Sequence, residues 1–277
     1  MEEVRYGVIG NVDSGKSTLI GVIVGDELDD GKGKARTSIL RHPHEKKSGR
    51  TSSISQNFTK VNEKKYLNFI DLAGHEKYLK TTIKGITGYY IDYAIIVVGA
   101  NMGVSYMTRE HLSIALAIKL PFIIVITKMD LAPKNVYDNT VKDLFKCIHR
   151  RAPTEITPKF MNNRNIMKDI NLEKEYPIFC ISNKTGKNVD HLKYFLNRLN
   201  TRFKIPDEKS IFDSSNECCE FTIDKKYNVN GVGLVISGKV TKGRLNKNDK
   251  MYIGPHNGVW LQVNLKSFHD NFREDVD

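Results

Sequence analysis

The chain has 277 residues, of which 40% are hydrophobic and 27% are charged, and its formal net charge is +11. That apolar fraction is enough to fill a core, which excludes a wholly disordered chain, and the length allows one large domain or two of ordinary size. The charge suits a polyanionic partner such as RNA or a nucleotide. It suits an ordinary basic surface equally well, because the chain has no arginine-rich arm.

The four cysteines, Cys147, Cys180, Cys218 and Cys219, have neither the spacing of a zinc site nor that of a disulfide framework. We therefore expect reduced thiols. The N-terminus lacks a basic segment followed by an apolar run, and the apolar runs are far shorter than the ~20 residues of a membrane-spanning helix. These features predict a cytoplasmic protein with no membrane partner.

Residues 1–205 alternate short apolar runs with amphipathic stretches. The apolar runs predict strands at Val4–Ile9, Tyr66–Ile70, Tyr93–Val98, Phe122–Ile126 and Ile178–Ile181. The amphipathic stretches predict helices at Lys16–Val24, Thr108–Ile118, Val136–Arg150 and Val189–Leu199. Such alternation indicates an α/β domain with a mostly parallel sheet and helices on both faces. A ligand is then expected beyond the carboxyl ends of the strands.

Three polar segments interrupt this pattern. Gly25–Gln56 is rich in glycine and charge and is expected to be a mobile loop, Thr154–Glu175 is expected to be a surface insertion, and residues 206–216 read as a linker. Residues 217–277 contain short β-rich runs at Cys219–Ile223, Gly233–Val240, Lys250–Ile253 and Trp260–Phe268. We interpret this second region as a partial antiparallel β-barrel.

A phosphate-binding pattern joins the first predicted strand to the first predicted helix. It reads Gly10-Asn11-Val12-Asp13-Ser14-Gly15-Lys16-Ser17, followed by Thr18. Its glycines allow backbone N–H groups to surround phosphates, and the start of the helix adds positive potential. In this pattern Lys16 neutralises the β- and γ-phosphate oxygens, and the hydroxyl of Ser17 holds Mg²⁺.

Three further motifs, each at the end of a predicted strand, favour GTP over ATP. They are Asp71-Leu72-Ala73-Gly74, Thr127-Lys128-Met129-Asp130 and Ser182-Asn183-Lys184. The carboxylate of Asp71 is placed to reach the metal, and the N–H of Gly74 to meet the γ-phosphate. Asp130 can accept hydrogen bonds from two N–H groups of guanine, a contact that adenine cannot make. All four motifs in this order form a specific signal for a P-loop GTPase domain.

Together these motifs resemble those of translational GTPases of the elongation factor Tu and elongation factor 1-alpha type, and above all the GTP-binding protein 1 and 2 branch. The resemblance also rests on His75-Glu76-Lys77-Tyr78, Ser48-Gly49-Arg50-Thr51-Ser52-Ser53 and Val232-Gly233-Leu234-Val235-Ile236-Ser237-Gly238. It covers essentially the whole chain. It implies GTP, GDP and Mg²⁺ as ligands, and a ribosome, tRNA or other RNA, with an activating or exchange factor, as partners.

The resemblance also implies roles for single residues. Gly25–Gln56 corresponds to the first switch and Glu76–Ile86 to the second. His75 corresponds to the histidine that orients the attacking water. From the residues alone, His75 could instead pack against its neighbours or cap a helix. The predicted catalytic residues are His75, Lys16 and Thr51, and the predicted metal ligands are Ser17, Thr51 and Asp71. The predicted nucleotide contacts are Asn11, Val12, Asp13, Ser14, Gly15, Lys16, Ser17, Thr18, Gly74, Thr127, Lys128, Asp130, Ser182, Asn183 and Lys184.

Two positions depart from the family pattern. Thr127 stands where the superfamily usually has asparagine, so we expect a weaker tie between the base-recognition loop and the phosphate loop, while guanine recognition by Asp130 is retained. Arg50 stands where elongation factors typically have an isoleucine that closes an apolar gate with Val12. Two interpretations stay open for Arg50: it reaches the phosphates, or it faces solvent, which we favour.

The sequence thus predicts a GTPase switch that is slow without an activator. The alternative is a GTP/GDP-gated module that binds RNA or protein with negligible turnover, and Asp130 disfavours an ATPase. The related factors have a complete barrel followed by another domain. By that comparison we expect either a fragment of a longer protein or a naturally shortened form.

Overall fold

The structure, a computed structural model, describes residues 2–39, 54–151, 156–203 and 218–269. The chain divides into two compact units, Met1–Phe203 and Lys204–Asp277. The first unit is built on one sheet, and the second on two antiparallel strand pairs.

A seven-stranded sheet with the order β2-β3-β1-β4-β5-β7-β6 forms the centre of the first unit. Its strands are β1 (Glu2–Gly10), β2 (Ser55–Asn62), β3 (Lys65–Asp71), β4 (Tyr93–Gly99), β5 (Phe122–Thr127), β6 (Thr157–Phe160) and β7 (Glu175–Cys180). All neighbouring strands are parallel except β2 and β3. The carboxyl ends of β1, β3, β5 and β7 therefore open onto the same edge of the sheet.

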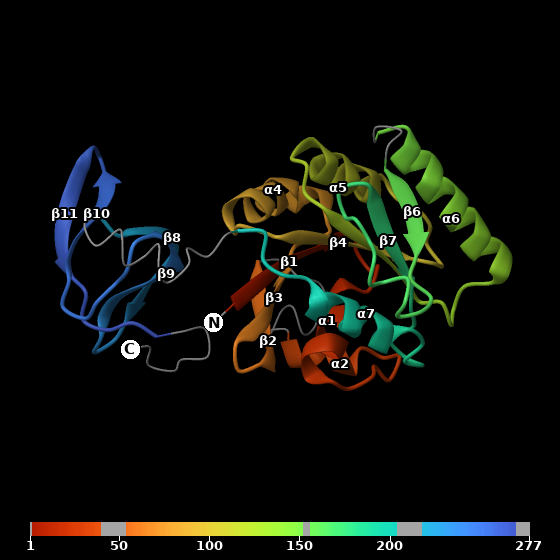
Figure 1. The fold of residues 1–277 in the computed structure, drawn as a ribbon, viewed down its shortest axis with the longest axis horizontal. Helices are drawn as coiled ribbons and strands as arrows, with labels where there is room; N and C mark the ends of the chain where they lie inside the picture. Colours follow the sequence, from red (N-terminus) through yellow and green to blue (C-terminus); the bar gives the residue numbers. More distant parts are fainter. Residues whose placement is uncertain (1, 40–53, 152–155, 204–217, 270–277) are drawn as a thin grey trace. The chain divides into compact units, whose positions relative to one another are not determined.

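Helices cover both faces of the sheet (Figure 1). One face carries α1 (Lys16–Gly25), α2 (Lys34–Ile39) and α7 (Val189–Arg198), and the other carries α4 (Leu79–Gly88), α5 (Tyr106–Ala117) and α6 (Lys134–His149). Buried side chains of β4 alternate between two apolar clusters: Ile95 and Val97 belong to one, Ile96 and Val98 to the other. This alternation is how an almost wholly apolar strand fills the core on both faces.

The predicted α/β fold is confirmed, and each predicted strand and helix of the first unit overlaps an observed one. Two expectations were wrong. The segment expected to be a loop contains α2 and the start of β2, and the expected surface insertion contains β6, which pairs with β7 in parallel. Both strands lie at sheet edges and are only partly buried, so their sequences carry no continuous apolar run.

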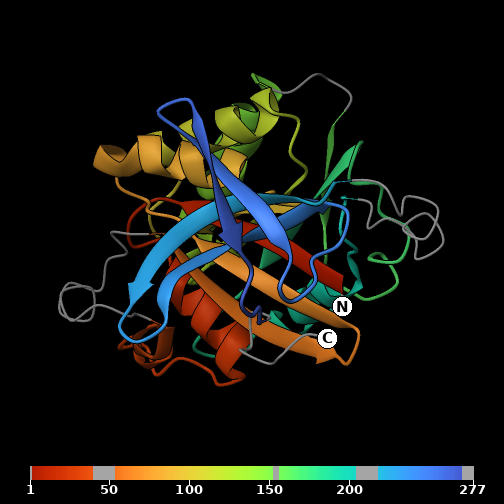
Figure 2. The ribbon, with the colours of Figure 1, turned by 90° about the vertical axis from the view of Figure 1, so that its left-hand side faces the viewer.

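The second unit contains two antiparallel hairpins, which correspond to the predicted partial barrel (Figure 2). One pairs β8 (Glu220–Val229) with β9 (Gly233–Lys242), and the other pairs β10 (Lys250–His256) with β11 (Val259–Asn264). All four cysteines are described, and none is in a disulfide. Among the described helices of the chain, none has the length and apolar character needed to cross a bilayer.

Candidate functional site

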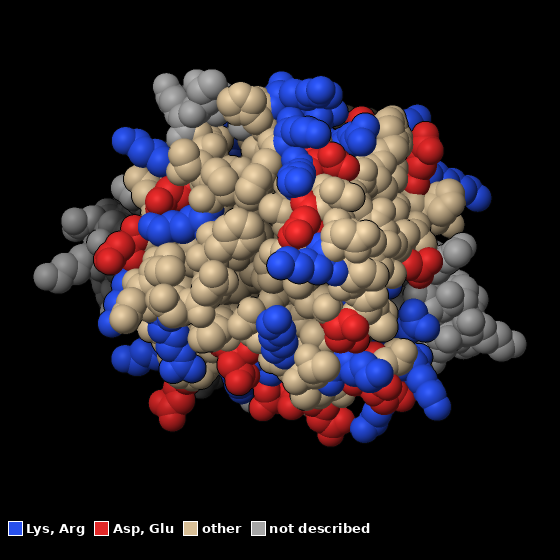
Figure 3. Space-filling view, turned by 90° about the vertical axis from the view of Figure 1, so that its right-hand side faces the viewer, with Lys and Arg blue, Asp and Glu red and all other residues tan. Residues whose placement is uncertain are grey.

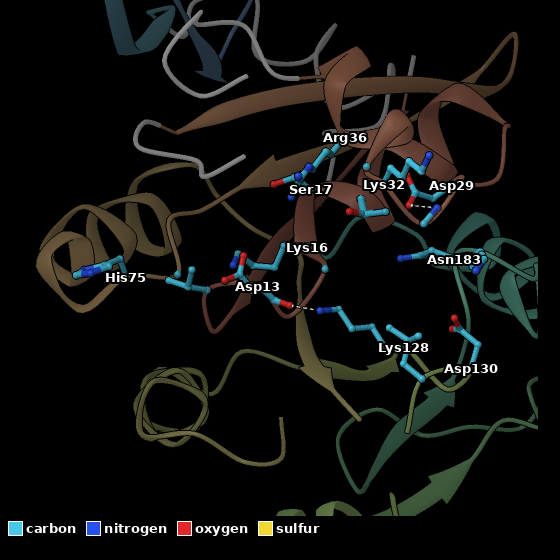
Figure 4. A pocket seen from close by; sticks show the side chains of 18 of the residues that line it. Asp13, Lys16, Ser17, Asp29, Lys32, Arg36, His75, Lys128, Asp130 and Asn183 are labelled. Atoms are coloured by element: carbon cyan, nitrogen blue, oxygen red, sulfur yellow. Dashed lines mark hydrogen bonds between the residues drawn. The ribbon is translucent and has the colours of Figure 1, made fainter. Parts of the chain in front are cut away.

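A cavity of about 570 Å³ lies at the edge of the sheet where β1, β3, β5 and β7 end (Figure 4). Most of the predicted nucleotide contacts line it: Val12, Asp13, Gly15, Lys16, Ser17, Thr18, Gly74, Lys128, Asp130, Asn183 and Lys184, with His75 beside them. Four motifs that are far apart in the sequence thus meet around one space. The predicted residue Thr51, like Arg50, lies outside the described residues.

The phosphate loop wraps one end of this cavity. Gly10 has φ +149°, and a Cβ there would lie 2.3 Å from the carbonyl oxygen of Val97, so no other residue fits. Gly15 takes a left-handed conformation immediately before α1 begins. The buried Lys16 donates a 2.8 Å hydrogen bond from Nζ to the carbonyl of Asn11. Burial lowers the pKa of Lys16, and the carboxylates of Asp71 and Asp13 oppose that shift.

Ser17 and Asp71 form the part of the site suited to a divalent cation. The hydroxyl of Ser17 donates a 2.7 Å hydrogen bond to Oδ2 of Asp71, which is buried at the end of β3. A hydroxyl and a carboxylate are the oxygen donors that Mg²⁺ uses alongside phosphate oxygens. Within the described residues no group of three or more His, Cys, Asp or Glu side chains is placed to hold a metal. The residues present therefore fit a Mg²⁺ ion that is shared with a phosphate ligand.

The base-recognition loops line the opposite end of the cavity. Oδ1 of Asp130 accepts a 2.6 Å hydrogen bond from the hydroxyl of Ser182, which fixes the position of the carboxylate. Nζ of Lys128 donates to the carbonyl of Asp13 at 2.7 Å, and Oγ1 of Thr127 donates to the carbonyl of Ser14 at 2.6 Å. Two hydrogen bonds thus connect the base-recognition loop to the phosphate loop. Of these two, only the bond from the hydroxyl of Thr127 is buried.

His75 lies on the wall of the cavity and is exposed to solvent. Its Nδ1 accepts a 3.1 Å hydrogen bond from the backbone N–H of Lys77, which caps the short helix η1 (Glu76–Tyr78). Its ring meets the ring of Tyr78 edge-on, with centroids 6.2 Å apart. In this conformation His75 is a capping residue at the border of the site, and its assignment to the attacking water stays a prediction.

Several residues of the cavity wall were not among the predicted nucleotide contacts, although all but Leu131 fall in the two predicted switch segments. Asp29, Gly31, Lys32, Gly33, Arg36, Lys77, Tyr78 and Leu131 also line the cavity. The N–H of Asp29 donates to the carbonyl of Asn183 at 2.9 Å, so the segment before α2 is bonded to the base-recognition end. The signal that could have found it is Asp29-Asp30, whose carboxylates accept from backbone N–H groups of residues 31–35 and begin α2.

One buried histidine lies behind the site. His111 on α5 is fully buried, and neither of its ring nitrogens has a hydrogen-bond partner among the described residues. Burial lowers its pKa to about 4, and the nearby charge of Lys16 contributes in the same direction. His111 is therefore neutral at physiological pH.

Comparison with known proteins agrees with this geometry. Residues 1–204 match the model of the elongation factor Tu GTP binding domain. The chain belongs to this family of translational GTPases. It is 41% identical over 295 residues to GTP-binding protein 1 of Xenopus laevis and 37% identical over 294 residues to human GTP-binding protein 2, which confirms the resemblance to that branch.

These alignments cover 96% and 97% of the chain but only 44% and 48% of the two relatives, so the chain spans about half their length. Its fold is similar to that of translation elongation factor SelB from Methanococcus maripaludis, solved in complex with the GTP analogue GppNHp. The TM-score is 0.66 at 22% identity, and the match covers 100% of this chain and 49% of that one. At this identity the likeness concerns the fold alone.

Proposed function

We propose that the chain is a GTPase switch that binds GTP with Mg²⁺ and hydrolyses it to GDP and phosphate. The observation that carries this proposal is the single cavity with Lys16 at one end and Asp130 at the other. A buried ammonium suits the β- and γ-phosphates, and a carboxylate held by Ser182 suits the two N–H groups of guanine. Membership of the GTP binding domain family supports the same ligand.

The residues around the phosphate end supply most of what hydrolysis needs. Ser17 and Asp71 would hold Mg²⁺, together with Thr51, which lies outside the described residues. When bound, the ion neutralises charge on the transferred phosphoryl group. Lys16 stabilises the charge that builds on the phosphate oxygens, and His75 orients the water from the cavity wall once the cap to Lys77 is released. We infer slow turnover in the absence of an activating factor.

We further infer a cytoplasmic protein that works with RNA, in the form of a ribosome, tRNA or another RNA. Membership of a family of translational GTPases and the net charge of +11 support such a partner. The alternative is a nucleotide-gated binding module with negligible turnover. It is favoured by the hydrogen bond from the N–H of Lys77 to Nδ1 of His75, because that bond occupies a ring nitrogen that would otherwise be free to orient water.

Single-turnover hydrolysis of GTP, with and without ribosomes and with ATP as competitor, tests the proposal. A GTPase switch hydrolyses GTP slowly, accelerates with its activator, and is not inhibited by excess ATP. Lys16→Ala is the control for contaminating phosphatases, because it removes the buried charge at the phosphates. Nucleotide-dependent RNA binding with no turnover under any condition would favour the binding module, and equal competition by ATP would overturn guanine recognition.

A further inference from the structure

A second hollow lies on the first unit, between α5 and the end of α6, and shares no residue with the nucleotide cavity. Its volume is about 630 Å³, and it is lined by Arg109, Asp143, Lys146, Cys147, Arg150 and Arg151. Figure 3 shows lysine and arginine side chains gathered at the top of the face that α6 and β6 occupy. Among the described residues, four cationic side chains and one carboxylate line this concave space.

The two walls of this hollow are bonded to each other. Nε of Arg151 donates to the hydroxyl of Ser113 on α5 at 2.9 Å, and that hydroxyl donates to the carbonyl of Arg109 at 2.8 Å. Arg151 therefore has a fixed position between the helices. The one carboxylate, Asp143, lies 3.9 Å from Nζ of Lys146, and both side chains are mostly exposed. A pair of this kind is screened by water and leaves the hollow strongly positive.

We propose that this hollow binds the phosphate groups of an RNA backbone. Guanidinium groups donate in a fork that matches phosphate oxygens, and several of them facing one concave space suit a group with several acceptors. A protein partner would need apolar or aromatic anchors at the centre of its interface, but the lining that the structure describes contains no large apolar side chain. The inference rests on the proposed RNA partner and assigns it a surface, and that surface shares no residue with the GTPase site.

The test is fluorescence anisotropy of a labelled single-stranded oligouridylate with the full 277-residue chain, titrated over a range of salt concentrations. The variant Arg109→Gln/Arg150→Gln removes two exposed charges from the hollow. The matched control is Arg164→Gln/Arg198→Gln, which removes two exposed arginines beside Tyr194, a second basic cluster on the same unit. Guanine nucleotide binding, measured for every variant, reports on folding independently of the hollow.

We expect the hollow variant to bind the oligonucleotide about tenfold more weakly, and its salt dependence to fall by about 1.4 in slope, since each phosphate contact contributes about 0.7 for single strands. The control variant should keep most of its affinity. Equal losses in both variants would show diffuse attraction by net charge and overturn the proposal. Displacement of the RNA by polyglutamate at equal charge would overturn it too, because it would assign the hollow to acidic protein segments.

Discussion

The hydroxyl of Thr127 donates a 2.6 Å hydrogen bond to the carbonyl of Ser14, so a side chain of the base-recognition loop supports the phosphate loop from behind. Thr127 is fully buried, and its hydroxyl also lies 3.4 Å from the carbonyl of Val98. Thr127, although shorter than the asparagine usual in the family, therefore connects the base-recognition loop to the phosphate loop through a 2.6 Å hydrogen bond.

Thr127→Val should lower the free energy of unfolding by about 1 kcal/mol, because valine keeps the shape but removes the donor to Ser14. The same change should speed GDP release, since the phosphate loop loses its support. Chemical denaturation and the dissociation rate of a fluorescent GDP measure the two effects. Thr127→Ser keeps the hydroxyl and should retain slow release; fast release from that variant would show that the methyl group, not the bond, matters.

Asp130→Asn should weaken GTP binding and strengthen binding of xanthosine triphosphate. An amide cannot accept from both N–H groups of guanine, but it offers a donor to the extra carbonyl oxygen of xanthine. Competition between GTP and xanthosine triphosphate measures this change in specificity. Ser182→Ala is the companion variant: it leaves the carboxylate in place but removes its 2.6 Å partner, so a smaller loss of GTP with no gain of xanthosine triphosphate is expected. Unchanged GTP affinity in Asp130→Asn would refute base recognition by this residue.

His75→Ala should leave nucleotide affinity nearly intact and slow stimulated hydrolysis, whereas Lys16→Ala should weaken binding itself. His75→Asn separates the two roles of the histidine, since asparagine is a good capping residue for the N–H of Lys77 but lacks the imidazole. If asparagine restores hydrolysis, the residue acts through the cap and not through water. Binding and single-turnover rates are measured on the same preparations.

Arg36→Ala should weaken GTP more than GDP, by about tenfold, because the side chain lines the phosphate end of the cavity and a γ-phosphate adds the charge that it meets. Lys34→Ala is the matched control: Lys34 is two residues away, and its exposed ammonium lies 3.2 Å from Glu27. Isothermal calorimetry gives the affinities of both variants for GTP and for GDP. Equal losses for GTP and GDP would place the contact elsewhere on the nucleotide.

The stability of the nucleotide-binding unit should fall as the pH drops below 6.5. The pKa of His111 is lowered to about 4 in the folded chain. Between pH 6.5 and 4, His111 is therefore protonated in the unfolded chain but neutral in the folded chain, and this difference favours unfolding. The slope attributable to this residue approaches about 1.4 kcal/mol per pH unit. His111→Leu should remove that slope in denaturation curves. An unchanged slope in His111→Leu would assign the acid sensitivity to other groups.

The part of the fold that the sequence predicts well is the part in which each strand is buried on both sides. In β4 and β5 every residue is buried, so a continuous apolar run is a physical requirement and a readable signal. The glycine-rich phosphate loop is readable for a similar reason, because at Gly10 a side chain would collide with the backbone.

The other parts of the fold and of the site could not be predicted from apolar runs or glycine patterns. The strand β6 is held by its parallel pairing with β7, and the short helix α2 by packing on α1 and by capping bonds from Asp29 and Asp30. The place of Arg36 in the cavity follows from how α2 packs on α1, which no local pattern of residues encodes. The cap from His75 to Lys77 likewise depends on the turn geometry after Gly74.

The backbone bond between Asp29 and Asn183 has a consequence for the lifetime of a bound nucleotide. It joins the segment before α2 to the loop after β7, where Leu28 lies beside Gly186 and Gly31 lies beside Lys184. If guanine binds at Asp130 as proposed, we expect this 2.9 Å backbone bond, at the base-recognition end of the cavity, to slow its release. We expect an exchange factor that separates these two segments to speed nucleotide release from the base-recognition end of the cavity.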